Sequence, residues 1–211
     1  MESKREIFVN YLKTKNIYLP TNEAVYENFY HAIIEANSKI NLFSRKMDID
    51  EIWTKHFLDS VSIFSVYSDF SKKNVLDFGT GGGFPGLPIK IICPDMKLTL
   101  LDSTKKKIEI LRQLVELIKI DNVNFLDHRI EDKAMSEYKG YFDIIVCRAV
   151  KIDNKLLYSL LNVLKNSGKM FLYMSKRQPV LFRSPDFLKI EEHEIEETGT
   201  KIIVGKKIWV K

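Results

Sequence analysis

The chain has 211 residues, 45% of them hydrophobic and 29% charged, with a formal net charge of +5, which is typical of a folded protein with one sizeable core. Apolar runs stay below the roughly 18 residues of a membrane helix, the first residues lack a secretory signal, and the charge is too low for a densely basic nucleic-acid module. The missing signal favours a cytoplasmic protein, and because Cys93 and Cys147 form no CxxC pair, we expect reduced thiols and no metal site.

The first 71 residues are expected to form a helical N-terminal extension. Apolar residues recur every three or four positions from Glu23 to Ile40, as on one face of a helix. The same spacing joins Trp53 to Phe64, after an acidic segment, Asp48–Glu51, that suits a helix N-terminus. Residues 1–70 hold 8 Lys and Arg against 10 Asp and Glu, so the positive excess lies in the rest of the chain.

From residue 72 onward, short apolar segments alternate with helical patterns. Five strands with intervening helices indicate a parallel, doubly wound sheet. The predicted strands are Asn74–Phe78, Lys97–Leu101, Val123–Leu126, Phe142–Val146 and Lys169–Tyr173, and the predicted helices are Phe84–Ile92, Lys105–Ile118 and Leu156–Leu164.

The last forty residues follow a different pattern. Two β-rich stretches, Leu188–Ile195 and Lys201–Val210, are separated by a segment too short for a crossover helix, so they should pair antiparallel. We therefore expect residues 72–211 to form one α/β domain with a seven-stranded mixed sheet.

A glycine-rich turn follows the first predicted strand. Residues 79–86 read Gly-Thr-Gly-Gly-Gly-Phe-Pro-Gly, with five glycines in eight positions. Glycine permits a tight turn and a close approach of the backbone to a ligand, and Pro85 fits only the first turn of the following helix. We therefore expect a ligand to lie over this turn.

The glycine spacing fits two classes of ligand. Gly81, Gly83 and Gly86 match the GxGxxG of dinucleotide-binding enzymes, with Asp102 at the distance of a ribose-binding acid. Gly79, Gly81 and Gly83 also match the shorter GxGxG loop that resembles class I S-adenosylmethionine-dependent methyltransferases. The antiparallel tail favours this Rossmann-like methyltransferase fold, because a dinucleotide domain normally continues with parallel strands or a substrate domain.

Charged side chains follow the next strands. Asp102 closes the second strand, where its carboxylate can accept hydrogen bonds from both ribose hydroxyls of an adenosyl group, while capping of the next helix falls to Ser103 or Thr104. Arg129–Asp132 follows the third strand and can flank the adenine. Arg148 follows the fourth strand and should point toward the same crevice.

Several segments resemble the glucose-inhibited division protein B family in order and spacing. The resemblance extends over about residues 25–178 and implies a methyltransferase that modifies N7 of a guanine in 16S ribosomal RNA, acting on that RNA or on the small ribosomal subunit. The segments are Asn41–Arg45, His56–Ser60, Asp77–Pro88, Leu101–Ser103, Arg129–Glu131 and Cys147–Ala149.

The resemblance also implies which residues hold the cofactor S-adenosylmethionine. Two departures from the family pattern are Cys147, where serine is commoner, and Lys176-Arg177-Gln178 in place of Lys-Gly-Gln, which weakens a substrate role for Lys176. With the turn and ribose residues, the expected cofactor set is Gly79, Gly81, Phe84, Asp102, Ser103, Ile130, Glu131 and Arg148.

Further residues are candidates for contacts with substrate RNA. Asp59 lies one helical turn from His56, so its carboxylate can hold the imidazole or contact the crevice. The basic run Lys105–Lys107 can bind phosphates or simply form a solvated helix face. The full set is Asn41, Arg45, His56, Asp59, Lys105, Lys106, Lys107 and Lys176.

We predict no catalytic acid or base and no metal. The unshared pair of guanine N7 needs no proton removed before it attacks a methyl group, so in-line transfer requires chiefly proximity and alignment. We expect a monomer. The residues leave open a methyltransferase for another RNA or a small molecule, and a non-catalytic RNA-binding protein of ribosome assembly.

Overall fold

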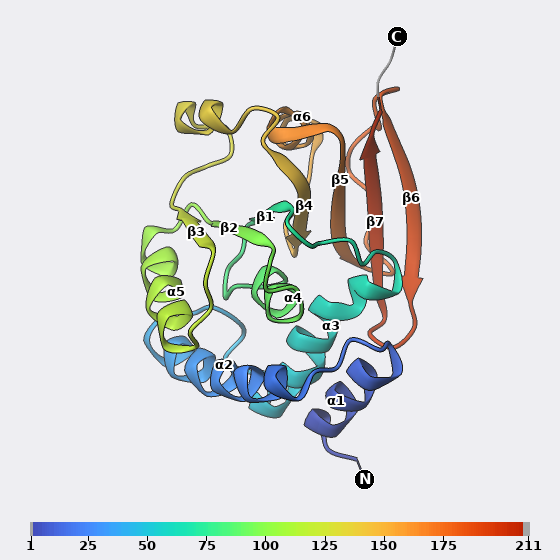
Figure 1. Ribbon diagram of the computed structural model, residues 1–211. Helices are drawn as coiled ribbons and strands as arrows, with labels where there is room; N and C mark the ends of the chain where they lie inside the picture. The colour runs from blue at the N-terminus through green and yellow to red at the C-terminus, as the bar shows by residue number, and fades with distance from the viewer. Residues whose placement is uncertain (1, 209–211) are drawn as a thin grey trace.

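The computed structural model describes residues 2–208, which contain a seven-stranded sheet in the order β3-β2-β1-β4-β5-β7-β6. The first five strands pair in parallel, and β7 pairs antiparallel with both β5 and β6. The expected mixed sheet is therefore confirmed (Figure 1). The strands are β1 Asn74–Phe78, β2 Lys97–Leu101, β3 Val123–Leu126, β4 Phe142–Arg148, β5 Leu164–Ser175, β6 Leu188–Ile195 and β7 Thr200–Lys207.

The predicted bounds of β1, β2, β3 and β6 agree with the structure, whereas β5 is longer than predicted. Its register against β4 shifts between Phe142 and Ile144, so the strand starts earlier and passes through an irregular stretch before it pairs regularly. Ser167 in that stretch has a positive φ of 65°, a conformation that interrupts alternation. The last residues of the predicted strand Lys201–Val210 lie outside the described part of the chain.

The two faces of the sheet pack against different helices. One core contains alternate strand residues such as Val75 and Ile144 together with α1, α2, α4 and α5, and the other contains Leu76 and Ile145 together with α6. This alternation is the expected consequence of the strand period of two. The helices are α1 Lys4–Thr14, α2 Pro20–Lys39, α3 Asp59–Val61, α4 Gly86–Ile92, α5 Lys105–Leu117 and α6 Asn154–Val163.

Two features of the N-terminal region were not predicted. Ser3 and Glu6 form a capping box that starts α1. The second predicted helix is not regular, since η1 Ile49–Glu51 and η3 Ser62–Ser65 are 3-10 helices and η2 Ile52–Leu58 is a π-helix. The predicted helix is therefore present, but only its short segment α3 is α-helical.

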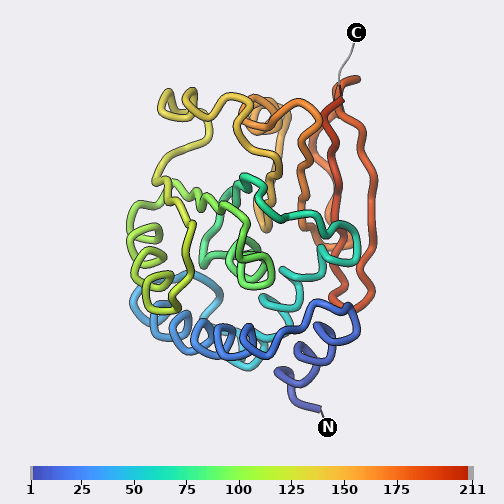
Figure 2. The backbone as a smooth tube through the Cα atoms, viewed as in Figure 1, coloured from blue at the N-terminus to red at the C-terminus, as the bar shows by residue number. Residues whose placement is uncertain are grey.

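The N-terminal helices pack against the rest of the chain through one apolar core. Figure 2 shows the blue N-terminal segment along one side of the green central part. The ring of Phe57 in η2 is fully buried, with its centroid 5.2 Å from that of Phe29 in α2 and 6.0 Å from that of Phe84 in the glycine turn. The proposed boundary at residue 71 falls between η3 and β1.

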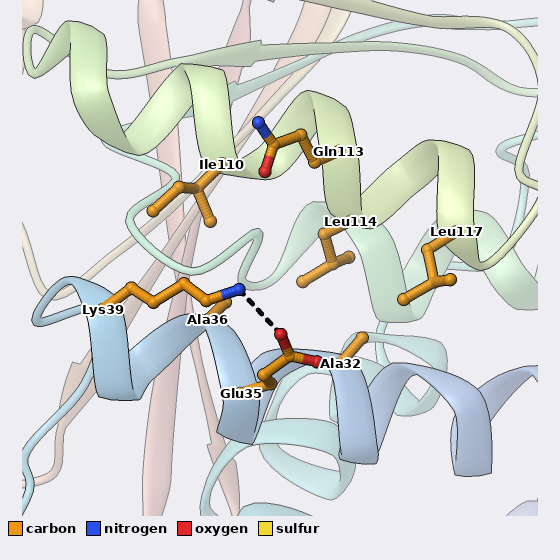
Figure 3. Close-up of a pocket in the computed structure, with 8 residues that line it drawn as sticks. All are labelled: Ala32, Glu35, Ala36, Lys39, Ile110, Gln113, Leu114 and Leu117. Carbon is orange, nitrogen blue, oxygen red and sulfur yellow. Dashed lines mark hydrogen bonds and ion pairs between the residues drawn. The ribbon is translucent and has the colours of Figure 1, made fainter.

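Helices α2 and α5 lie side by side with a shallow hollow of about 110 Å³ between them (Figure 3). Ala32 and Ala36 of α2 face Leu114 and Leu117 of α5, and the small alanines allow the helices to approach. Between residues 2 and 208, every helix is too short or too polar to span a bilayer.

We predict that Phe57→Ala lowers the free energy of unfolding by about 3 to 5 kcal/mol, because it leaves a cavity where the N-terminal helices meet the glycine turn. Leu117→Ala is the control, since Leu117 is 63% exposed and should change stability by less than about 0.5 kcal/mol. Denaturant titration of both variants measures the difference. A loss below 1 kcal/mol for Phe57→Ala, or a separate transition for the N-terminal helices, would contradict this packing.

Candidate functional site

A pocket of about 300 Å³ opens at the carboxyl ends of β1, β2 and β3. The strand order reverses at this point, because β2 and β3 lie on one side of β1 whereas β4 and the later strands lie on the other. Such a switch point is the usual ligand site of a parallel α/β sheet. The pocket is lined by Phe78, Gly79, Leu101, Asp102, Ser103, His128, Arg129, Ile130, Glu131 and Val150.

The glycine turn forms one wall of this pocket. The backbone N–H groups of Gly79 and Thr80 donate to the carbonyl oxygen of Leu101 at 2.9 and 3.1 Å, which docks the turn on the end of β2. Gly79 has a φ of +70°, and a Cβ there would lie 2.5 Å from a methyl group of Val150. Glycine is therefore required at position 79 both by the backbone and by the closeness of the opposite wall.

Asp102 lines the pocket, and its carboxylate accepts hydrogen bonds from two backbone N–H groups. Its Oδ1 accepts from the N–H of Thr104 at 2.9 Å, and its Oδ2 accepts from the N–H of Gly81 at 3.2 Å. Lys107 Nζ lies 3.8 Å from the same Oδ2. Because a carboxylate oxygen accepts more than one hydrogen bond, each oxygen retains capacity for a ligand hydroxyl.

The expected capping of α5 by Ser103 or Thr104 is a wrong prediction. Thr104 is the N-cap residue, but its side chain caps no backbone group. Asp102 instead accepts from the N–H of Thr104 and so orders the approach to the helix itself. The ribose-binding role of Asp102 stays a prediction.

The remaining wall of the pocket combines apolar and charged groups. Ile130 is 4% exposed and provides an apolar surface, while the neighbouring Glu131 is exposed to solvent. The carboxylate of Asp102 can accept from the hydroxyls of a ribose, and the side chain of Ile130 can pack against an adenine, as an adenosyl group requires. The residues present therefore fit the cofactor expected from the sequence.

Asp77, the residue before the last of β1, accepts hydrogen bonds from the glycine turn. Its Oδ2 accepts from the hydroxyl of Thr80 at 2.7 Å and from the N–H of Gly86 at 2.9 Å. Burial raises the pKa of Asp77 to about 6, against the opposing effect of these hydrogen bonds. Gly86 is needed here because a Cβ would lie 2.7 Å from the carboxylate.

Phe84 and Arg148 do not line the pocket and form a separate cluster beside it. Arg148 Nη1 donates to Asp59 Oδ2 at 3.0 Å and to the carbonyl oxygen of Lys55 at 3.1 Å. The guanidinium carbon of Arg148 lies 5.1 Å from the centre of the Phe84 ring. We call His56, Asp59, Phe84 and Arg148 the His56 cluster.

The cluster includes part of the π-helix. The carbonyl of Lys55 in η2 accepts from Arg148 of β4, and π-helical turns occur frequently at functional sites. Asp59 does not hold His56 directly but is joined to it through Arg148, and it also accepts from Thr200 of β7. A contact between residues 93 positions apart cannot be read from local helical spacing.

His56 is enclosed in this cluster as a neutral imidazole. Its ring stacks on Phe84 with centroids 4.7 Å apart and lies 5.4 Å from the ring of Phe43. Burial, and then the nearby charge of Arg148, lowers the pKa of His56 to about 3. Arg148 Nη2 donates to Nδ1 at 2.6 Å, which leaves the ring proton on Nε2, and Nε2 has no partner among residues 2–208.

The other RNA candidates are not brought together. Arg45 is exposed beside a separate hollow of about 390 Å³, and Asn41 is exposed in the preceding part of that loop. Lys105 and Lys106 are exposed at the start of α5. Lys176 is paired with Glu194 at 3.2 Å, and Lys107 faces Asp102 as described above.

Several residues of the pocket were not predicted from the sequence. Phe78, Leu101 and Val150 line the pocket, and His128 lies on its rim. The positions of Phe78 and Leu101 at strand ends were a usable signal, because the open edge of a parallel sheet is formed by these residues. Within the described ranges, no group of three or more His, Cys, Asp and Glu side chains gathers in a way that could hold a metal ion.

Comparison with known proteins places these features in a family. Residues 22–198 match the GidB family model, described as rRNA small subunit methyltransferase G. A protein of that name from Staphylococcus saprophyticus is 36% identical over 184 residues, covering 86% of this chain and 71% of the relative. Another from Mycoplasma capricolum is 34% identical, covering 94% of this chain and 87% of the relative.

Solved structures show the same fold at low sequence identity. A SAM dependent methyltransferase from Aquifex aeolicus superposes with a TM-score of 0.57 at 15% identity, covering 75% of this chain and 93% of that one. A mutant of MtNAS in complex with S-adenosylmethionine superposes with a TM-score of 0.61 at 12% identity, covering 97% of this chain and 76% of that one.

We predict that Asp102→Ala weakens the binding of S-adenosylmethionine by at least tenfold, because it removes the acceptor for the ribose hydroxyls and releases two backbone N–H groups. A loss of two hydrogen bonds to a charged acceptor is worth more than about 1.4 kcal/mol. Calorimetry with the purified protein measures the affinity. Glu109→Ala, which removes an exposed carboxylate of α5 that is not part of the pocket lining, is the matched control, and equal affinities for Asp102→Ala and the unaltered protein would refute the ribose role.

We predict that His56 makes the fold sensitive to acid. The unfolded chain binds a proton at His56 near pH 6.5, whereas the folded protein resists protonation until about pH 3. The stability that His56 contributes is therefore present above pH 6.5 and is lost as the pH falls, by about 2 kcal/mol between pH 7 and pH 5.

The measurement compares the free energy of unfolding at pH 7 and pH 5 for the unaltered protein and His56→Gln. The variant should lose about 2 kcal/mol less on acidification. His31→Gln is the control, because it alters an exposed imidazole of α2 and leaves the contact between His56 and Arg148 in place. The same acid dependence in His56→Gln and His31→Gln would show that His56 is not held neutral.

Proposed function

The chain belongs to the rRNA small subunit methyltransferase G family, and we propose that it transfers the methyl group of S-adenosylmethionine to N7 of a guanine in the RNA of the small ribosomal subunit. The observation that carries the proposal is the pocket at the ends of β1, β2 and β3, which is lined by the Asp102 carboxylate, by Gly79 of the glycine turn and by the apolar side chain of Ile130. That arrangement suits an adenosyl group. Family membership supplies the RNA substrate.

Each side of the pocket has a distinct task in holding the cofactor. Asp102 accepts from the ribose hydroxyls, the turn at Gly79 allows the ligand to lie against the backbone, and Ile130 covers the adenine. S-adenosylmethionine supplies a methyl group activated by its sulfonium. Val150 and Phe78 complete the apolar lining and exclude water from the bound group.

The chemistry needs no base, and the titratable groups nearest the turn are engaged in the structure. The Nδ1 of His56 accepts from Arg148, and the carboxylate of Asp77 is fully buried and accepts from Thr80 and Gly86. Guanine N7 attacks with its own unshared pair, so the protein contributes alignment. Proximity of this kind supplies on the order of 7 to 11 kcal/mol of the barrier in well-oriented reactions.

The His56 cluster positions the substrate side of the reaction in this proposal. Arg148 ends β4 next to the pocket and joins the sheet to η2, so it fixes the N-terminal helices relative to the cofactor. Phe43 and the exposed Asn41 and Arg45 belong to the adjoining loop, which contacts the base or its phosphates. We expect the protein to act in the cytoplasm as a monomer.

The test is incubation of the full-length protein with methyl-labelled S-adenosylmethionine and small ribosomal subunits that lack this modification. Digestion of the RNA and mass spectrometry should yield one labelled 7-methylguanosine per subunit. Asp102→Ala is the inactive control. Label in another nucleoside, in small metabolites alone, or in no product at all would contradict the proposal, and the last result with intact cofactor binding would favour an assembly protein.

A further inference from the structure

Three lysines lie in one row across the antiparallel part of the sheet. Lys169 of β5 is the cross-strand partner of Lys206 of β7, and Lys206 is the partner of Lys189 of β6. Their side chains project from the same face, because all three line a single hollow of about 370 Å³. We call Lys169, Lys189 and Lys206 the lysine row.

The lysine row is not neutralised by the protein. No carboxylate among residues 2–208 lies within ion-pair distance of any of the three ammonium groups, whereas Lys201 pairs with Glu192 at 3.1 Å in the same hairpin. Glu191 lies in the hollow but faces His193 at 3.6 Å. Like charges on directly opposite strand positions destabilise a sheet, so this arrangement is costly unless a ligand offsets it.

The hollow that contains the lysine row is also lined by aromatic and apolar side chains. Lys169 Nζ lies 4.1 Å from the centre of the Tyr67 ring, which projects from the segment after η3. Val66 and Phe171 complete the apolar part of the lining. With three lysines against the single carboxylate of Glu191, the concave lining has a net positive charge, which attracts anions.

The row lies away from the cofactor pocket. Lys169 is the neighbour of Ile144 near the start of β4, whereas Tyr173, at the level of Arg148, is four residues further along β5. The pocket instead lies at the far ends of β1, β2 and β3, on the other part of the sheet from β5, β7 and β6 (Figure 1). The row therefore cannot contact the cofactor.

We propose that the lysine row binds the phosphate backbone of the substrate RNA at a second site, distant from the guanine that is methylated. The inference rests on the proposed function for the nature of the anion. The row extends over two strand spacings, about 10 Å, which suits neighbouring phosphates of a polynucleotide better than one small ion. Lysine binds such phosphates as a point charge, without reading sequence.

The experiment replaces all three lysines by glutamine in the full-length protein and measures binding to small-subunit RNA, stripped of protein, over a range of KCl concentrations. Each lost phosphate contact lowers the slope of log affinity against log salt by about 0.7 to 0.9, so the slope should fall by about 2. Affinity near 0.1 M salt should fall at least tenfold. Because the variant relieves repulsion between like charges, its melting temperature should not fall and its cofactor affinity should be unchanged, which verifies that it folds.

The matched control replaces by glutamine three exposed lysines scattered over other parts of the surface, Lys4, Lys119 and Lys155. Its slope of log affinity against log salt should change by less than half as much as that of the lysine row variant. Equal slopes for the two triple variants would overturn the inference. So would an effect seen with assembled subunits and not with bare RNA, which would assign the row to a ribosomal protein.

Failure of this inference is distinguishable from failure of the proposed function. Binding is measured without methyl transfer, so a row variant that binds like the control, while the unaltered protein still forms 7-methylguanosine, refutes the row alone. An unaltered protein that binds RNA through the row and forms no 7-methylguanosine refutes the methyl transfer alone.

Discussion

The structure depends on one carboxylate that holds two pieces of backbone together. Asp102 lines the pocket and accepts from Gly81 in the turn after β1 and from Thr104 at the start of α5, so it joins the two segments beside the pocket. Neither contact uses all the acceptor capacity of the carboxylate. The same group can therefore shape the pocket before a ligand enters and bind the ligand afterwards, which keeps the ordering cost of binding small.

A second set of contacts joins the N-terminal helices to this site. Arg148 extends from the end of β4 to the π-helix η2 and to His56, and Phe57 buries its ring between α2 and the glycine turn. The helices before residue 71 therefore do more than flank the sheet. They hold the His56 imidazole against the ring of Phe84 and in contact with Arg148, beside the cofactor pocket.

The sequence predicts the features that depend on neighbouring residues and does not predict the contacts between residues far apart in the chain. The bounds of β1 and β2 follow from short apolar runs ended by glycine or aspartate, and these are local signals. The bridge from Arg148 to Asp59 and the unfavourable pairing of Lys169 with Lys206 join residues far apart in the chain, so no local pattern predicts them. Five of the eight expected cofactor residues line the pocket, whereas Gly81 acts through Asp102, and Phe84 and Arg148 lie in the adjoining cluster. Resemblance to a family transfers residue identities more readily than it transfers contacts.

The central claim is that the cavity beside Asp102 receives the adenosyl end of the methyl donor. A crystal structure of the protein soaked with S-adenosylmethionine tests it most directly. We expect the ribose hydroxyls on the Asp102 carboxylate, with the adenine against Ile130. Electron density for the donor in the His56 cluster or in the groove between α2 and α5, with the cavity at Asp102 filled only by solvent, would contradict it.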